Sequence, residues 1–159
     1  MELSDRIAGM DIASVVFGGI LSVANRLQRV LDPVLPEVTT SQLWLLMVLS
    51  LFKEPPTLSE LAEASDRSHQ NVRQLLNKLE AKGFVALTPD AKDARATRVS
   101  ATPKADQWGA DTAPQAADFM AAMFSGISPT DLDALARNLL TIHSALGHLN
   151  QSDHRPADS

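Results

Sequence analysis

The chain has 159 residues, of which 45% are hydrophobic and 21% charged, a composition typical of a globular protein with a sizeable core. It contains no cysteine, which excludes disulfides and thiol-based redox sensing. The longest nearly apolar run, Leu43–Phe52, is far shorter than the ~20 residues that cross a membrane. The N-terminus also lacks the basic start of a secretory signal. We therefore expect a cytoplasmic protein without a membrane partner.

The first segment, residues 1–36, is predicted to form a long helix that ends at Asp32-Pro33, because proline cannot continue a helix. Apolar side chains recur along it at intervals of three or four residues, at Val16, Ile20, Val23, Leu27 and Val30. A helix with such a stripe needs a partner surface, and we interpret it as a dimerisation helix.

A helix-turn-helix is predicted next. Thr57-Leu58-Ser59-Glu60 is a capping box, in which each side chain satisfies a free backbone N–H at the start of a helix. Asp66 is suited to the left-handed conformation that the following turn needs. The second helix is predicted to run from an N-cap at Ser68 to Gly83, which suits the left-handed position after a helix, and it is the expected recognition helix.

The second helix has two different faces. One is apolar and should be buried, with Val72, Leu75, Leu76 and Leu79. The other is rich in hydrogen-bond donors and has no carboxylate before Glu80. On it we expect contacts to major-groove base edges from Gln70, Asn71, Arg73 and Gln74 and to phosphates from Ser68, Asn77 and Lys78, with His69 either touching DNA or solvated.

A charged hairpin is predicted after this helix, with strands at Phe84–Thr88 and Ala96–Ser100. A hairpin in this position makes a winged helix, and its tip carries Lys92 and Arg95, of which Arg95 is expected to enter a minor groove. Asp93 is expected to orient the wing through a charge pair. Taken alone, the hairpin favours a solvated loop whose charges only keep the protein soluble. Joined to the preceding helix pair, it favours the wing.

Charge is unevenly distributed along the chain. The net charge is −5, but residues 57–104 hold eight basic and six acidic side chains, a balance of +2, against −7 for the remainder. The middle segment is thus the one suited to face DNA. Because +2 is a modest charge, we expect moderate, salt-sensitive binding.

The C-terminal segment, residues 105–150, is predicted to contain two helices, with Pro114 interrupting the first. The second begins at Ser128-Pro129 and carries an apolar seam at Leu132, Leu135, Leu139, Ile142, Leu146 and Leu149. This seam either packs within one subunit or forms a homodimer, which we favour. A dimer would read a palindromic operator in double-stranded DNA. The polar tail, 151–159, is expected to be disordered.

Several motifs in this order resemble the multiple-antibiotic-resistance-regulator (MarR) family of bacterial transcription factors. The resemblance extends from about Leu21 to Leu149 without gaps in the winged region, and its most specific part is Pro89-Asp90-x-x-Asp93-x-Arg95 followed by Val99-Ser100-x-Thr102. Other matching parts are Thr39-x-x-Gln42-x-x-x-Leu46, Leu58 to Ala62, Asn71-Val72 with Leu75, and Leu79 to Val85. The resemblance implies a mainly α fold, with a winged helix-turn-helix at 37–104 between dimerisation helices, and a regulator that most often represses transcription.

The same resemblance implies a small aromatic or amphipathic ligand between the dimer helices and the winged domain. Residues of suitable type are Phe17, Leu21, Trp44, Met47, Leu51, Trp108, Thr112, Phe119 and Met123. Residue by residue, a place in the core is the stronger interpretation of such side chains.

Other functions have less support. We find no nucleophile elbow, P-loop, dinucleotide fingerprint or His-Glu-x-x-His, and therefore expect neither an enzyme nor a cofactor. His143 and His148 are five apart and do not share a helical face, so no metal site is expected. The serious alternative is a winged helix that binds protein, or a degenerate regulator without DNA binding. It is favoured by the acidic balance and by Leu87, Thr88 and Gln74, where the family often has arginines. Ala105 also replaces a usual glycine.

Overall fold

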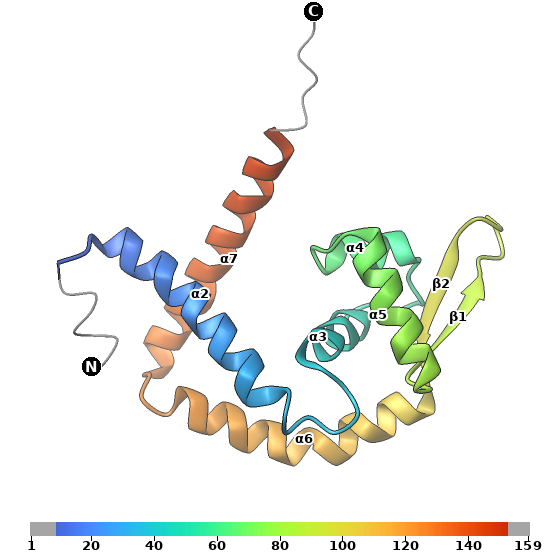
Figure 1. The fold of residues 1–159 in the computed structure, drawn as a ribbon, viewed down its shortest axis with the longest axis horizontal. Coiled ribbons are helices and arrows are strands. Elements are labelled where there is room, and N and C mark those ends of the chain that lie inside the picture. Colours follow the sequence, from blue (N-terminus) through green and yellow to red (C-terminus); the bar gives the residue numbers. More distant parts are fainter. Residues whose placement is uncertain (1–8, 153–159) are drawn as a thin grey trace, which may run out of the picture. The chain divides into compact units, whose positions relative to one another are not determined.

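The computed structural model describes residues 9–152, which fold into helices and a two-stranded antiparallel sheet (Figure 1). The chain divides after Trp108 into two compact units. The mainly α fold with a winged helix-turn-helix is therefore confirmed. The elements are α2 (Ile12–Leu31), α3 (Thr40–Leu49), α4 (Leu58–Ala64), α5 (His69–Ala81), β1 (Val85–Pro89), β2 (Thr97–Ala101), α6 (Pro103–Phe124) and α7 (Pro129–Ser152).

In the part of the chain that the structure describes, the buried core lies between Val38 and Val99. Helices α3, α4 and α5 contact one another, β1 packs against α5, and β2 packs against α3 and α4. On α5 the predicted apolar face is buried except for Leu75, which lies half-buried at the edge of the core. The winged helix thus has a core of its own, which consists of Val38, Leu45, Val48, Leu49, Leu58, Leu61, Ala62, Val72, Leu76, Leu79, Phe84, Val85 and Val99.

Short-range polar contacts begin the helices of this domain. The hydroxyl of Thr57 accepts the backbone N–H of Glu60 at 3.2 Å, while the Glu60 carboxylate accepts the N–H of Thr57 at 2.6 Å, which confirms the capping box. The N–H of Thr57 first, and then its hydroxyl, which donates to the same carboxylate at 2.9 Å, lower the pKa of Glu60. Asp66 and Gly83 have φ angles of 53° and 78°, so each takes the left-handed conformation predicted for it.

The wing strands begin one residue later than predicted. Phe84 is fully buried and donates its N–H to the carbonyl of Leu79 at 2.9 Å, so it closes α5 instead of opening β1. Ala96 donates to the carbonyl of Asp93 at 2.9 Å and therefore belongs to the turn. The strands pair from Val85 opposite Ala101 to Pro89 opposite Thr97.

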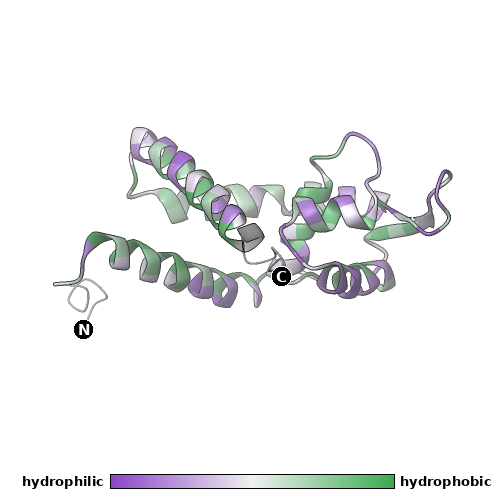
Figure 2. Cartoon of the chain, turned by 90° about the horizontal axis from the view of Figure 1, so that it is seen from above, coloured by the Kyte–Doolittle hydropathy of each residue, from purple (hydrophilic) through white to green (hydrophobic). Residues whose placement is uncertain are grey.

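Helices α2 and α7, each taken by itself, expose many apolar side chains. The N-terminal part of α2 is coloured hydrophobic in Figure 2, and α2 contains no buried residue. On α7, Leu135, Leu139, Leu146 and Leu149 are each at least 39% exposed. No helix within residues 9–152 has both the length and the hydropathy to cross a membrane. These exposed apolar side chains lie on the two helices for which the sequence predicts dimerisation, which stays a prediction.

Two predictions about the C-terminal helices need correction. Pro114 lies inside α6, which continues through it to Phe124, because one missing N–H does not end a helix whose other turns are bonded. Helix α7 starts at the predicted cap, where Ser128 accepts the N–H of Asp131 at 3.2 Å. It runs to Ser152, two residues into the expected tail, and residues 153–159 lie outside the described part.

Candidate nucleic-acid interface

The polar face of α5 is fully presented to solvent. The fold buries Val72, Leu76 and Leu79 on the opposite side, with none of their surface exposed. Because α5 is a regular helix, the residues between them point outward together. The exposed donors predicted to reach DNA are His69, Gln70, Asn71, Arg73, Gln74, Asn77 and Lys78, preceded by the exposed N-cap Ser68.

The first turn of α5 is organised by two side chains. The Ser68 hydroxyl oxygen accepts the N–H of Asn71 at 3.2 Å, as expected of an N-cap, and its own O–H is a separate donor. Arg67, in the turn before α5, donates to the amide oxygen of Asn71 at 3.2 Å. Sequence reasoning missed this contact. It fixes the amide of Asn71 and brings a guanidinium to the start of the interface.

Glu80, the first carboxylate along α5, is turned toward the wing. Its Oε1 accepts the backbone N–H of Leu87 in β1 at 3.2 Å. The contact joins the recognition helix to the wing. It also directs the negative charge of Glu80 away from the donor-bearing face. The local sequence pattern does not predict this contact, because Glu80 and Leu87 belong to different elements.

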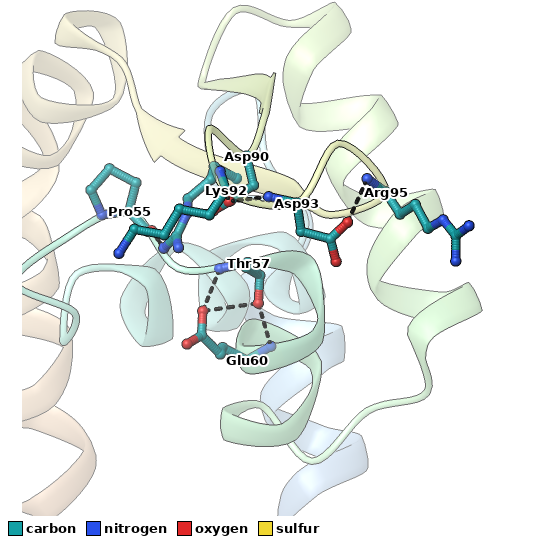
Figure 3. A network of polar contacts seen from close by, with 8 residues as sticks. Pro55, Thr57, Glu60, Asp90, Lys92, Asp93 and Arg95 are labelled. Carbon is teal, nitrogen blue, oxygen red and sulfur yellow. Dashed lines mark hydrogen bonds and ion pairs between the residues drawn. The ribbon is translucent and has the colours of Figure 1, made fainter.

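The wing turn is built around Asp90 (Figure 3). One carboxylate oxygen of Asp90 accepts the N–H groups of Lys92 and Asp93 at 2.7 and 2.9 Å, and the other forms an ion pair with Arg98. Together these contacts lower the pKa of Asp90 to about 2. The bonds from the two backbone N–H groups contribute most, and the bond from Arg98 comes next. The carboxylate is thus ionised throughout the physiological range.

Within residues 9–152, Asp93 does not make the charge pair that the sequence predicted for it. Its carboxylate accepts the backbone N–H of Arg95 at 3.0 Å, and its own N–H is held by Asp90. The ion pair belongs to Asp90 because Asp90 directly follows β1 and faces Arg98 on β2, whereas Asp93 lies in the exposed turn. Sequence spacing alone could not distinguish the two aspartates.

Arg98 ties the wing to the rest of the domain. Its Nη1 donates to the carbonyl oxygen of Pro55 at 2.7 Å, and the next residue, Val99, donates its N–H to Pro56 at 2.8 Å. From the sequence, Arg98 is only one of the basic charges of the segment. The structure shows that it fixes the wing to the segment before α4.

At the wing tip, Lys92 and Arg95 are exposed. Figure 3 shows the guanidinium of Arg95 directed away from the polar network of the turn. Within residues 9–152, no hydrogen bond or ion pair holds the side chains of Arg73, Lys78, Lys92 or Arg95. In contrast, Lys82, Arg98 and Lys104 bind other groups of the protein. Four of the eight basic side chains of this segment are therefore available to an external anion without losing an internal contact.

The residues predicted for a ligand pocket are distributed over both units. Phe17, Leu21, Trp44, Met47 and Leu51 belong to the first unit and are between 45% and 79% exposed. Thr112, Phe119 and Met123 belong to the second unit, so a pocket that includes them remains a prediction.

Trp108 has a structural role within the first unit. Its ring packs edge-on against Phe84 with centroids 5.8 Å apart, and its indole N–H donates to the carbonyl of Pro36 at 2.9 Å. Trp44 likewise places its indole N–H 3.5 Å from the carbonyl of Ser65. In the described part of the chain, no group of three or more histidine, aspartate or glutamate side chains is placed to hold a metal.

Comparison with known proteins agrees with this geometry. The MarR family model matches residues 37–96. Among solved structures, the MepR–DNA complex of S. aureus shares 22% identity with a TM-score of 0.73, covering 86% of this chain and 99% of that one. AbsC from Streptomyces coelicolor, a MarR family transcriptional regulator, shares 21% identity with a TM-score of 0.76, covering 87% and 97%.

BpsR of Bordetella bronchiseptica, whose DNA binding is regulated by 6-hydroxynicotinic acid, shares 21% identity with a TM-score of 0.70, covering 80% of this chain and 98% of that one. Identities at this level establish a shared fold. No curated protein matches the chain. The MarR family model thus matches the winged helix-turn-helix at residues 37–96, and the solved structures share the fold of this chain.

Proposed function

We propose that the protein is a cytoplasmic, homodimeric transcriptional regulator that binds a palindromic DNA site, and that it acts as a repressor. The observation that carries the proposal is the exposed face of α5, which bears donors without a free carboxylate, beside a wing that directs Arg95 outward. Such a helix suits the major groove, and an arginine-tipped hairpin suits the adjacent minor groove.

The residues divide into two roles. Gln70, Asn71, Arg73 and Gln74 read base edges, because amide and guanidinium groups make paired hydrogen bonds to bases. Ser68, Asn77, Lys78 and Lys92 hold phosphates, and Arg95 contacts the minor groove and the backbone; His69 lies beside them at the start of α5.

Dimerisation is supported by the exposed apolar surface. Val16, Val23 and Val30 on α2 are 45%, 60% and 49% exposed in the single chain, and α7 exposes its leucine seam. Contiguous apolar surface of this kind is normally covered by a partner. A second copy of the chain would cover it and provide the second recognition helix.

Control by a small aromatic or amphipathic molecule is part of the proposal. DNA binding by BpsR, which shares this fold, is regulated by a molecule of that kind, 6-hydroxynicotinic acid. Here Trp44 and Met47, one turn apart on α3, expose 45% and 53% of their surface and offer an apolar contact. A ligand can shift DNA binding only through different affinities for the two arrangements of the dimer.

The alternative is a winged helix that binds protein. It is favoured by the fact that Lys82, Arg98 and Lys104 are engaged within the protein, which reduces the charge available for DNA. An electrophoretic mobility shift at low salt separates the two functions. The probe is the duplex upstream of the protein's own gene, together with a site selected from random DNA.

Wild-type binding that is lost in Arg95→Ala supports the regulator. Lys53→Ala is the matched control, because it removes an exposed cation outside α5 and the wing and should leave binding intact. Absence of any shift with the wild type at low salt would favour the protein-binding alternative.

A further inference from the structure

We propose that Lys82 is a positioning residue that locks the linker between α2 and α3 to the end of the recognition helix, and so fixes the separation of the two recognition helices in the dimer. The inference rests on the proposed function for its DNA readout, and it concerns a residue that is placed outside the DNA-contacting set.

Lys82 is the C-cap of α5, and its side chain leaves the DNA face. Its ammonium donates to the carbonyl oxygen of Glu37 at 2.6 Å and to the side-chain oxygen of Gln42 at 3.1 Å. Gln42 is 2% exposed, so this end of the lysine reaches the edge of the core. Two of the three N–H donors of the ammonium are therefore used within the protein.

Two further side chains, those of Lys104 and Trp108, donate hydrogen bonds to the dipeptide Pro36-Glu37 of the linker. Lys104 lies 4.7 Å above the ring of Phe84, and its ammonium donates to the Glu37 carboxylate at 2.6 Å and to the carbonyl of Lys82 at 2.9 Å. The indole of Trp108 donates to the carbonyl of Pro36 at 2.9 Å. The linker, the end of α5 and the start of α6 thus meet in one hydrogen-bonded cluster.

The backbone of the linker at this cluster has an unfavourable conformation that needs surrounding contacts to maintain it. Glu37 has a φ of 67°, in the left-handed region that a side chain with a Cβ disfavours. Such a conformation persists where the surrounding contacts fix it. At the beginning of the linker, the Asp32 carboxylate accepts the N–H and the hydroxyl of Thr40 at 2.7 and 2.6 Å. Both ends of the linker are therefore fastened to the winged helix.

This arrangement gives Lys82 a different role from Lys78, one turn earlier on the same helix. Lys78 is exposed and has no polar partner within residues 9–152, so it is free to neutralise a phosphate. Removal of the Lys82 ammonium instead takes away its hydrogen bond to the Glu37 carbonyl and its hydrogen bond to the buried side chain of Gln42. The linker then holds α5 less tightly, and the distance between paired recognition helices becomes less sharply defined.

Lys82→Met and Lys78→Met form a matched pair, because each removes one positive charge from α5 and keeps a flexible apolar stem of similar length. Their affinities are measured on a selected operator and on operators whose half-sites are moved by one or two base pairs, over a series of salt concentrations. Circular dichroism and thermal midpoints establish that both variants fold.

For Lys82→Met we expect several-fold weaker binding at the best spacing, a several-fold smaller penalty for altered spacing, and an unchanged salt slope. For Lys78→Met we expect an unchanged spacing penalty and a salt slope smaller by about one. A wild-type spacing penalty in Lys82→Met overturns the inference. So does a salt slope reduced by about one, because it would make Lys82 a phosphate contact.

A measurement without DNA separates this inference from the proposed function. The chain has no cysteine, so Glu63→Cys on the exposed side of α4 gives a single labelling site per protomer. Electron–electron double resonance between two spin labels reports the distance across the dimer. Lys82→Met should broaden that distribution and Lys78→Met should not. Equal widths overturn the positioning role even if the wild type binds DNA, whereas broadening supports it even if no operator is found.

Discussion

Asp90 and Arg98 form an ion pair across the base of the wing, and the two side chains differ in exposure. The side chain of Asp90 is 6% exposed, whereas that of Arg98 is 36% exposed. The guanidinium of Arg98 also donates to the carbonyl oxygen of Pro55. The pair joins the start of the wing loop to β2 and, through Pro55, to the segment before α4. Arg95 lies between the two partners in sequence, in the loop whose ends this pair joins.

We predict that Asp90→Asn flattens the acid dependence of stability. The pKa of Asp90 is lowered from 3.8 to about 2 by the N–H groups of Lys92 and Asp93 and then by Arg98. A carboxyl with a lowered pKa stabilises the folded state above its unfolded pKa, and this contribution is lost as the pH falls through the folded pKa. The urea midpoint of the wild type should therefore fall between pH 3.8 and about pH 2.

In Asp90→Asn the midpoint should be lower at neutral pH and should change less over that acid interval. Asp93→Asn is the control, since it removes a carboxylate from the same loop but keeps an oxygen for the N–H of Arg95. Its midpoint at neutral pH should stay near that of the wild type. Parallel acid curves for Asp90→Asn and the wild type would show that Asp90 does not link the wing to stability.

Glycine to alanine substitutions at two positions should have opposite effects. Gly83 has a φ of 78°, and an added Cβ would lie 3.7 Å from Lys104, an ordinary contact. The cost of Gly83→Ala is therefore backbone strain, about 1 kcal/mol of unfolding free energy. Gly109 lies inside α6 with open space around it, so Gly109→Ala should stabilise by up to ~1 kcal/mol. Urea unfolding measures both, and a loss of equal size at both sites would contradict the backbone explanation.

Substitutions on α5 should separate base reading from phosphate binding. Arg73→Ala and Gln74→Ala should change the preferred operator, with about 1–3 kcal/mol of discrimination lost at the contacted base pair. Lys78→Ala should weaken all sequences alike and lower the salt slope by about one. Fluorescence anisotropy on a set of single-base operator variants measures these effects. A uniform loss across every variant for all three proteins would refute this division of roles.

Features that depend on neighbours in sequence were predictable. The capping box at Thr57, the N-cap at Ser68 and the left-handed residues Asp66 and Gly83 each rest on partners within one turn. The side chains of Thr57 and Ser68 bond backbone groups three residues away, and Asp66 and Gly83 are residue types that tolerate a left-handed φ, so the local pattern determines the local structure. The position of the winged helix in the chain follows from these signals.

Features that join distant segments were not predictable. Lys82 binds Glu37 45 residues away, and Arg98 binds Pro55 43 residues away. In the sequence both are counted among the eight basic residues of 57–104, because nothing local shows that their charge is used within the protein. For the same reason Asp93 was expected to form the ion pair that Asp90 makes. The sequence therefore indicates the interface but overstates its available charge.

The leucine seam of α7 leads to a prediction about assembly. Leu139 lies on the seam and is 43% exposed in the single chain, whereas the neighbouring Leu140 lies off it and is 70% exposed. If the seam packs against a second copy, Leu139→Glu places a charge in the interface at a cost on the order of 3 kcal/mol, roughly a 100-fold weaker dimer. Leu140→Glu carries the same change on the other face and should remain dimeric.

Sedimentation velocity over a range of concentrations measures the dissociation constants. Dissociation of Leu140→Glu alone would place the interface on another face of α7, and the loss of operator binding should follow whichever variant is monomeric.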